Sequence, residues 1–382
     1  MHAQLNIEAK INRHKSVCRL ILPMSKNILS RLRPELQALS AYQVTDASGM
    51  VKLDAMENPY QWSDEINAAW LQYLSHAAIN RYPEPDPEDL KQQLKQRFGP
   101  EHEDIALLLG NGSDELIQLL VLAVSKPDAS VLTVVPSFSM YQLISQMLGI
   151  DCHCVPLDDN FQLDQAAMLA AIEQYDPALI FLAYPNNPTA NLWSRDDLEQ
   201  ILQASQGLVV IDEAYGPFAS DSFVEQLPEY PNMLVLRTAS KLGLAGLRFG
   251  WLAANRELIA ELNKLRLPYN INLLTQMTMQ FALQNYLIFA RQAERICQSR
   301  TKLVAGLAAM PELIVFPSEA NFLLIRLKNQ SADHVFSRVL SQKVLIKNVS
   351  KQAGLAACLR VTVGTEDENQ ALLEAFRYAL SE

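Results

Sequence analysis

Short apolar segments alternate with segments of helix length between residues 105 and 255, and this alternation constrains the fold more than any other feature of the chain. Each apolar segment is short, and several are rich in Val and Ile, which is typical of buried strands in a parallel sheet. Helices between such strands cover both faces of the sheet. We therefore predict an α/β domain with a large, mostly parallel sheet, whose expected strands are Ile105–Leu109, Val131–Val135, Leu179–Ala183, Leu208–Ile211, Met233–Leu236 and Phe249–Ala253.

The pattern changes after residue 255 and predicts a second, smaller α+β domain. Longer helical segments are expected first, at about 256–266, 274–288 and 291–309. Shorter elements follow, with strands at Asn321–Leu327, Val344–Ile346 and Leu359–Val363 and a helix through Val335–Leu340. Thr365 and Glu368 have the spacing of a capping box, which predicts that a last helix starts there.

These patterns give the predicted division of the chain. A large domain covers residues 53–270, a small domain covers 271–382, and residues 31–52 form an arm of the small domain. Residues 1–30 are expected to be an N-terminal extension outside the folded domains. We do not interpret the extension as an export signal, because its apolar run is too short and is interrupted by Arg19 and Pro23.

Composition excludes several classes of partner. The chain has 42 acidic and 32 basic residues, a net charge of −10, and no long Lys/Arg tract. Nucleic-acid binding needs clustered positive charge, so no nucleic-acid partner is expected. No stretch approaches the roughly 20 apolar residues of a membrane span, so no membrane contact is expected either. Small molecules are the expected partners.

The five cysteines are too few and too scattered for a disulfide framework, which favours a reducing cytoplasm. Cys152-His153-Cys154 has the look of a metal pair, with both thiols on one face of a strand. A tetrahedral site needs further ligands, and no second Cys/His pair supplies them. We therefore predict no metal site.

The segment Arg237–Arg248 is the richest in chemistry. Lys241 lies in a loop rich in Ser, Gly and Ala, and Arg248 follows it seven residues later. A lysine amine attacks an aldehyde when burial or a neighbouring cation lowers its pKa. Thr238, Ser240 and Arg248 are donors that suit a phosphate. The alternative interpretation, a surface lysine near a glycine turn, is equally compatible with this segment alone.

Three further segments follow expected strands, at the sheet edge where α/β proteins bind ligands. Asp212-Glu213-Ala214-Tyr215 places a carboxylate at the end of a strand. Pro185-Asn186-Asn187-Pro188-Thr189 fixes an amide in a rigid turn, although Asn and Pro also favour a simple exposed turn. Gly110-Asn111-Gly112-Ser113-Asp114-Glu115 opens a helix, whose first N–H groups suit an anion.

Taken in order, these motifs resemble those of the fold-type I aminotransferases, which use pyridoxal 5′-phosphate (PLP), and within them the histidinol-phosphate aminotransferase family. The resemblance runs from about residue 30 to the end of the chain, and the ordered set is far more specific than any one motif. The set is Glu57-Asn58-Pro59-Tyr60, Asn80-Arg81-Tyr82-Pro83, Gly112-Ser113-Asp114-Glu115, Asn187-Pro188-Thr189, Asp212-Glu213-Ala214-Tyr215, Ser240-Lys241, Arg248 and Leu359-Arg360-Val361-Thr362-Val363-Gly364.

The resemblance implies a fold-type I PLP-dependent transferase and a role for each matching residue. Lys241 holds PLP covalently and then moves a proton, and Asp212 pairs with the ring nitrogen. Asn187 and Tyr215 hydrogen-bond the ring hydroxyl, which makes Lys241, Asp212 and Tyr215 the expected catalytic residues. Phe138 stacks on the ring. The residues implied for the phosphate are Gly112, Ser113, Asp114, Thr238, Ser240, Arg248 and, from the neighbouring subunit of a homodimer, Tyr82.

The implied substrate pocket contains Arg360, which binds a carboxylate or a phosphate. The family's second phosphate-binding arginine falls at Lys347, a point charge without a bidentate fork. Asn187 and Tyr42 are further expected substrate contacts, although surface packing is an almost equally good interpretation of Tyr42.

Two departures from the family pattern carry expectations of their own. Ala190 stands where glycine usually follows Asn-Pro-Thr, which predicts that this residue does not need a positive φ here. The spacing from Lys241 to Arg248 is one residue shorter than in many relatives, so the loop is expected to be tighter.

The function that the resemblance implies is transamination between histidinol phosphate and 2-oxoglutarate in histidine biosynthesis. A decarboxylase for a phosphorylated amino acid such as threonine phosphate, or a broader aromatic aminotransferase, would use the same fold. A PLP-binding regulatory module is disfavoured, because the full set of catalytic residue types is present.

Overall fold

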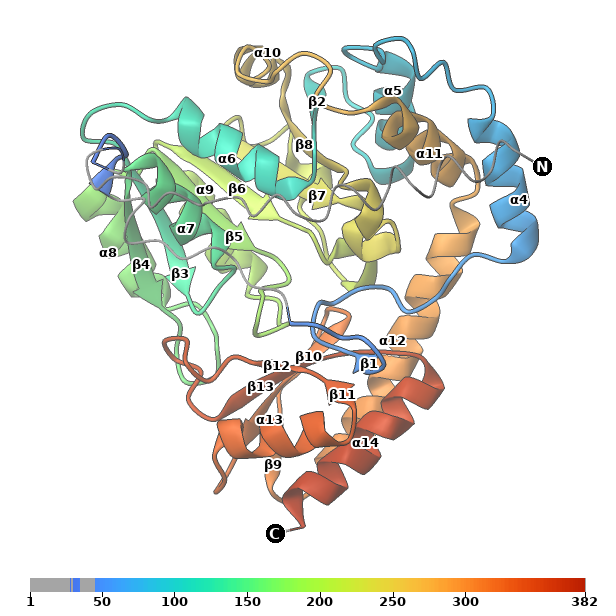
Figure 1. Cartoon of the computed structure of the whole chain (residues 1–382). Coiled ribbons are helices and arrows are strands. Elements are labelled where there is room, and N and C mark those ends of the chain that lie inside the picture. The colour runs from blue at the N-terminus through green and yellow to red at the C-terminus, as the bar shows by residue number, and fades with distance from the viewer. Residues whose placement is uncertain (1–27, 29, 35–44, 382) are drawn as a thin grey trace, which may run out of the picture. The chain divides into compact units, whose positions relative to one another are not determined.

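The computed structural model describes residues 28, 30–34 and 45–381. The chain divides into residues 1–44 and residues 45–382, and the fold described below is that of the second unit (Figure 1). The predicted extension at 1–30 and part of the predicted arm at 31–52 therefore lie largely outside the described residues.

The large sheet has seven strands in the order β2-β8-β7-β6-β5-β3-β4. β8 runs antiparallel to both of its neighbours, and the β7-β6-β5-β3-β4 pairs are parallel. The predicted large, mostly parallel sheet is confirmed. Its strands are β2 (Ile105–Gly110), β3 (Ser130–Val135), β4 (Asp151–Pro156), β5 (Leu179–Ala183), β6 (Leu208–Asp212), β7 (Met233–Thr238) and β8 (Gly250–Asn255).

Successive residues of a strand point to opposite faces of the sheet, and in this sheet residues of both orientations lie in hydrophobic cores. In β6, Val209 and Ile211 belong to one hydrophobic core, whereas Val210 belongs to another. Residues of α5, α8 and α9 complete the first core, and residues of α6, α7 and α10 complete the second. These helices are α5 (Glu88–Phe98), α6 (Ser113–Ala123), α7 (Met140–Leu148), α8 (Gln165–Tyr175), α9 (Arg195–Ala204) and α10 (Arg256–Leu262).

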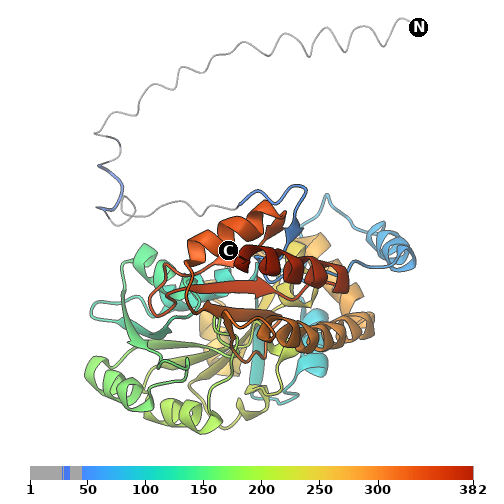
Figure 2. The ribbon, with the colours of Figure 1, turned by 90° about the horizontal axis from the view of Figure 1, so that it is seen from below.

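A second sheet forms near the C-terminus and is antiparallel, in the order β12-β13-β10-β9. Its core includes Phe322, Val335, Leu359 and Phe376. Figure 2 shows α14, in dark red, alongside the strands of this sheet. The elements are β9 (Leu313–Val315), β10 (Phe322–Leu327), β12 (Lys347–Asn348), β13 (Cys358–Thr362), α13 (Ala332–Ser341) and α14 (Glu366–Leu380).

The predicted capping box of α14 is confirmed: Thr365 accepts from the backbone of Glu368, whose side chain accepts from the backbone of Thr365. A short parallel pair, β1 (Val51–Lys52) with β11 (Val344–Leu345), brings the segment before residue 53 to the C-terminal part of the chain.

Two helices, α11 (Leu273–Gln284) and α12 (Leu287–Ala308), lie in the sequence between the elements of the large sheet and those of the small sheet. α11 packs against α4 (Asp64–Leu74) and α5. Within α12, Phe289 belongs to a core of the large sheet and Ala293 to the core of the small sheet. The packing therefore changes inside α12, and the predicted domain boundaries stay a prediction.

β4 was not among the predicted sheet strands, although Cys152-His153-Cys154 was read as part of a strand. It is an edge strand with the sequence Asp-Cys-His-Cys-Val-Pro and mostly half-buried side chains. Strands at the edge of a sheet do not need the apolar character by which buried strands are found. In the described part of the chain, no helix is both long and apolar enough to cross a membrane.

Candidate active site

A cavity of about 250 Å³ lies at the carboxyl ends of β5, β6 and β7. This is the edge at which open α/β sheets bind their ligands. Ten of the predicted site residues line it together, which places segments far apart in sequence around one space. They are Ser113, Asp114, Phe138, Asn187, Asp212, Tyr215, Thr238, Ser240, Lys241 and Arg248.

Lys241 lies in a short 3-10 helix, Ala239–Leu242, directly after β7. The Thr238 hydroxyl starts this turn by accepting from the backbone N–H of Ser240 at 3.1 Å. The Lys241 amine donates to the Ala55 carbonyl at 3.4 Å. Burial, followed by the positive charge of Arg360, lowers the pKa of Lys241 to about 8. A sizeable fraction of this amine is therefore neutral and nucleophilic near physiological pH.

Asp212 ends β6 and is buried. Its carboxylate accepts from the Tyr141 hydroxyl at 2.6 Å and from the backbone N–H of Ala214 at 3.0 Å. Burial raises the pKa of Asp212 to about 6, although both hydrogen bonds act against this rise. A buried carboxylate of this kind gains most from a cationic partner.

Asn187 joins the cavity to Arg360. Its amide donates to the Tyr215 hydroxyl at 3.2 Å, and its oxygen accepts from Arg360 Nη1 at 2.6 Å. Arg360 Nη2 also donates to the Asp54 carbonyl at 2.9 Å. Asn187, Tyr215 and Arg360 therefore lie next to one another.

The start of α6 and Arg248 form a cradle at one end of the cavity. Gly112 has a φ of 86°, and a Cβ at this position would lie 2.8 Å from Arg248 Nη2. No side chain caps α6 at Gly112, and Arg248 Nη2 lies 3.1 Å from an oxygen of Asp114. Backbone N–H groups and a guanidinium meet here, as in anion sites. Although the spacing from Lys241 to Arg248 is one residue shorter than in many relatives, Arg248 still reaches the cradle. Its backbone there has a φ of 49°.

Lys347 lies opposite Arg360 in the β12–β13 pair, and residues directly opposite each other share one face of a sheet. Two cations in this arrangement repel each other, so the arrangement favours an anion between or above them.

Among the described residues, four predicted site residues do not line this cavity: Gly112, Arg360 and Lys347, whose positions are given above, and Tyr82. Tyr82 is 80% exposed and stacks on Tyr269 with ring centroids 4.6 Å apart. Among the described residues, neither of these tyrosines lines the cavity. Tyr42 lies outside the described residues.

The expectation for Ala190 was wrong, because this residue has a φ of 67°. Its backbone N–H donates to the Asn186 carbonyl at 2.8 Å, and its carbonyl accepts from Glu319 N–H at 2.7 Å. The buried turn therefore keeps the left-handed conformation without glycine, because tertiary hydrogen bonds hold both sides of the residue.

Sequence reasoning missed Tyr141 and Met56. Tyr141 is fully buried, stacks on Phe181 and donates to Asp212. Met56 lines the cavity, and its sulfur accepts from the Tyr215 hydroxyl at 3.4 Å. The position of Met56 beside the Glu57-Asn58-Pro59 motif could have indicated that it lies at the site. Tyr141 lies inside an apolar helix, and nothing in its sequence context indicated a role at the site.

The residues present fit PLP. An amine is available for its aldehyde, a carboxylate for its ring nitrogen, a hydroxyl and an amide for its ring oxygen, and the cradle for its phosphate. The close approach at Gly112 leaves room for a phosphate against the backbone. The fold and the site thus define a PLP-dependent transferase of fold type I.

Comparison with known proteins is more specific. Residues 48–376 match the family Aminotransferase class I and II, and the chain belongs to this family. It is 50% identical over 347 residues to histidinol-phosphate aminotransferase 2 of Nitrosococcus oceani, covering 91% of this chain and 96% of that protein. It is also 47% identical to histidinol-phosphate aminotransferase 1 of Ralstonia nicotianae over 370 residues, covering 95% and 98%.

Solved structures agree on the fold. Histidinol-phosphate aminotransferase from Sinorhizobium meliloti, in complex with PLP, superposes with a TM-score of 0.82 at 24% identity and covers 92% of this chain and 98% of its own. L-threonine-O-3-phosphate decarboxylase from Porphyromonas gingivalis superposes with a TM-score of 0.72 at 22% identity, covering 87% and 100%. The fold alone therefore does not separate transamination from decarboxylation.

Proposed function

We propose that this protein is a PLP-dependent aminotransferase that transfers the amino group between histidinol phosphate and 2-oxoglutarate in histidine biosynthesis. The observation that carries the proposal is the Lys241 amine, with its pKa near 8, in one cavity with the Asp212 carboxylate and the anion cradle. The names and the identity of the relatives support histidinol phosphate as substrate.

When bound, PLP supplies an aldehyde that accepts an amine and a ring that delocalises negative charge. The chain's own groups determine the rest. With PLP bound, Lys241 Nζ would take the proton that leaves the substrate Cα and would later give it back, as a transamination requires. The lowered pKa of Lys241 suits both the uptake and the release of that proton.

With PLP bound, Asp212 would keep the ring nitrogen protonated, because a buried carboxylate is stabilised by a cation at hydrogen-bonding distance. The Tyr141 hydroxyl fixes the orientation of Asp212. Asn187 and Tyr215 orient the ring oxygen, and Phe138 and Ala214 limit the access of water as parts of the cavity wall. The start of α6, with Thr238, Ser240 and Arg248, anchors the phosphate.

Substrate anions bind at Arg360 and Lys347. The substrates carry a phosphate in one half-reaction and carboxylates in the other, and a guanidinium binds either. The opposed placement of the two cations across β12 and β13 supports an anion site there. Tyr42 and Asn187 are proposed as further substrate contacts.

We propose in addition that the protein acts as a cytoplasmic homodimer in which Tyr82 reaches the neighbouring subunit's phosphate site. Tyr82 does not serve its own cavity and is largely exposed, and the nearby sequence contains Ile79, which is 79% exposed. Leu267, 73% exposed, precedes Tyr269, the stacking partner of Tyr82. Exposed apolar side chains of this kind support contact with a second copy.

Lys241→Ala tests the proposed function. The wild-type protein should bind PLP and show the visible absorption of a lysine-bound cofactor, and it should transaminate histidinol phosphate. The variant should lose both the absorption band and transamination, while its circular dichroism stays unchanged. A wild-type protein that does not bind added PLP, or a variant that keeps the band, would contradict the proposal.

A further inference from the structure

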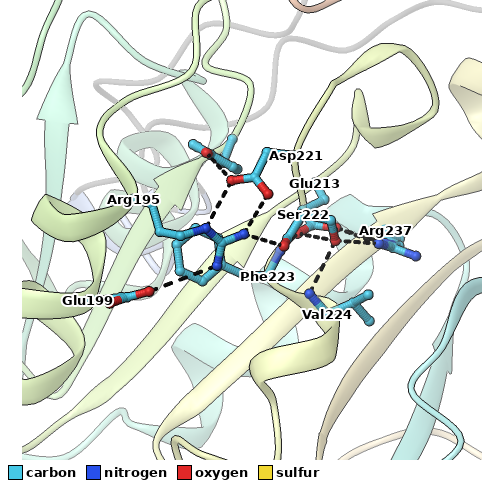
Figure 3. Close-up of polar contacts among 9 residues, drawn as sticks. Arg195, Glu199, Glu213, Asp221, Ser222, Phe223, Val224 and Arg237 are labelled. Atoms are coloured by element: carbon cyan, nitrogen blue, oxygen red, sulfur yellow. Dashed lines mark hydrogen bonds and ion pairs between the residues drawn. The ribbon is translucent and has the colours of Figure 1, made fainter.

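A buried ion pair joins Glu213, directly after β6, to Arg237 near the end of β7 (Figure 3). Successive residues alternate sides, so Asp212 and Thr238 line the cavity, whereas their neighbours Glu213 and Arg237 do not. Arg237 Nη2 lies 2.6 Å from Glu213 Oε2, and the two side chains are 14% and 0% exposed. The pair therefore lies directly behind two strand ends that carry site residues.

The pair is fully hydrogen-bonded. Arg237 Nε also donates to Glu213 at 2.9 Å, and its Nη1 donates to the Phe98 carbonyl at 2.9 Å. The second carboxylate oxygen of Glu213 accepts from the backbone N–H of Phe223 at 2.6 Å and from the Ser222 hydroxyl at 2.9 Å. Loss of one partner would leave the other as an uncompensated buried charge.

We propose that Arg237 is a positioning residue for the cofactor: by neutralising Glu213 behind the sheet, it keeps the adjacent Asp212 ionised toward the cofactor's ring nitrogen. This inference rests on the role proposed above for Asp212. Arg237 itself does not line the cofactor cavity, so it acts through Glu213 and the strand ends.

The charges around Asp212 support this role. Tyr141 faces it from α7, Asp114 from the start of α6, and Glu213 and Tyr215 from its own segment. Burial is the main cause that raises the pKa of Asp212 to about 6, and the charges of Asp114 and Glu213 raise it further. Removal of Arg237 would leave the charge of Glu213 uncompensated, so the pKa of Asp212 would rise again.

The test measures the affinity of the free proteins for PLP as a function of pH, without substrate. The affinity of the wild type should fall in two steps as the pH drops, first through the pKa of Lys241, about 8, and then through the pKa of Asp212, about 6. The lower step is the acid limb that this test follows. Arg237→Met should move this acid limb upward by about one pH unit, a tenfold loss of affinity on the limb. The ionisations of PLP itself are the same in every variant and do not contribute to the difference.

Two further proteins separate charge from structure. The double variant Glu213→Gln/Arg237→Met removes both charges and should return the limb to its wild-type position. Arg195→Met is the matched control, because Arg195 pairs with Asp221 at 2.5 Å in the same network and also contacts Ser222. It should leave the limb in place. A purely structural role would lower the affinity at every pH without moving the limb.

Glu213→Gln alone keeps the test decisive if Arg237→Met does not fold. It leaves the positive charge of Arg237 near Asp212, so the acid limb should move downward. An unmoved limb in Arg237→Met, no recovery in the double variant, or an upward shift in Glu213→Gln would overturn the inference.

If Asp212→Asn keeps the wild-type limb, the proposed role of Asp212 fails. If Asp212→Asn loses the limb and Arg237→Met does not shift it, the inference alone fails.

Discussion

Asp212 shows at the scale of one residue how the site is prepared for its cofactor at a cost to the free protein. Its pKa rises from 3.8 to about 6 because it is buried. A carboxyl group whose pKa is raised in the folded state does not change the free energy of unfolding below pH 4, where it is neutral in both states. The free energy of unfolding then decreases as the pH rises through the folded-state pKa of about 6. At neutral pH this cost amounts to about 3 kcal/mol.

Asp212→Asn should therefore stabilise the free protein at pH 8, by up to about 3 kcal/mol, while it weakens PLP binding. The difference from the wild type should shrink as the pH falls to 4, because Asp212 is then neutral and its Tyr141 hydrogen bond can remain. Urea unfolding of both free proteins at the two pH values measures this. A variant that is equally stable or less stable at pH 8 would refute the assigned cost of burial.

Prediction from the sequence succeeded best where chemistry and strand ends coincide. Asp212 ends a buried strand, and Lys241 and Asn187 lie in the turns that follow two other buried strands, so their meeting at one sheet edge could be predicted. Tyr141 could not be predicted, because its hydroxyl finds Asp212 only after α7 packs on the sheet. The φ of Ala190 also depends on tertiary hydrogen bonds, which local residue preferences do not contain.

At the scale of elements, the turn between β2 and α6 determines how closely a phosphate approaches the backbone. Gly112→Ala should weaken PLP binding at least tenfold, because its Cβ would lie 2.8 Å from Arg248 Nη2 at a φ of 86°. Binding of pyridoxal, which lacks the phosphate, should change much less. Equilibrium titration with both compounds measures the contrast.

Gly149→Ala is the matched control for this prediction. Gly149 ends α7 with a φ of 75°, and no atom lies within 4 Å of the position that a Cβ would take there. Both variants place a Cβ at a positive φ, but the backbone strain is larger at Gly112, whose ψ is 168°, than at Gly149, whose ψ is 29°. Only Gly112→Ala enters the cradle, so the comparison of PLP with pyridoxal separates the phosphate contact from the strain. Equal losses of PLP affinity in both variants would show that strain, rather than the cradle, explains the effect.

The elements themselves were predictable where burial dictates their composition. β5 has the predicted bounds, and the capping box of α14 is the one that Thr365 and Glu368 indicate. β4 was not among the predicted sheet strands, because an edge strand keeps polar side chains. α10 ends at Leu262, earlier than the expected 266. Helix ends depend on packing and capping that periodicity does not resolve.

At the scale of the whole molecule, the proposed homodimer predicts complementation between two defective subunits. A mixed dimer of Lys241→Ala and Tyr82→Ala chains has one site with an intact Lys241 and an intact Tyr82 from the other chain. Random reassociation should therefore restore about a quarter of the wild-type activity. Mixing the two inactive proteins after reversible dissociation measures this.

No recovery in these mixtures, with dimers present by light scattering, would show that Tyr82 does not serve the neighbouring site. Each variant mixed with itself provides the baseline, and a mixture of wild type with Lys241→Ala shows that exchange takes place.

The charge of the molecule also takes on a local meaning. The chain carries a net charge of −10, yet Lys241, Arg248, Lys347 and Arg360 occupy the proposed site for anionic cofactor and substrates. Net charge thus describes the surface as a whole, whereas binding depends on where a few cations are placed.

The central claim is the transamination of histidinol phosphate at Lys241, and the first half-reaction tests it most directly. The PLP-loaded protein is mixed separately with histidinol phosphate, threonine phosphate, phenylalanine and glutamate, and the cofactor spectrum is followed by stopped flow. Histidinol phosphate and glutamate should convert the cofactor to its amine form, with a keto product and no CO2, and histidinol phosphate should do so faster than phenylalanine. Release of CO2 from threonine phosphate with no response to histidinol phosphate would contradict the account.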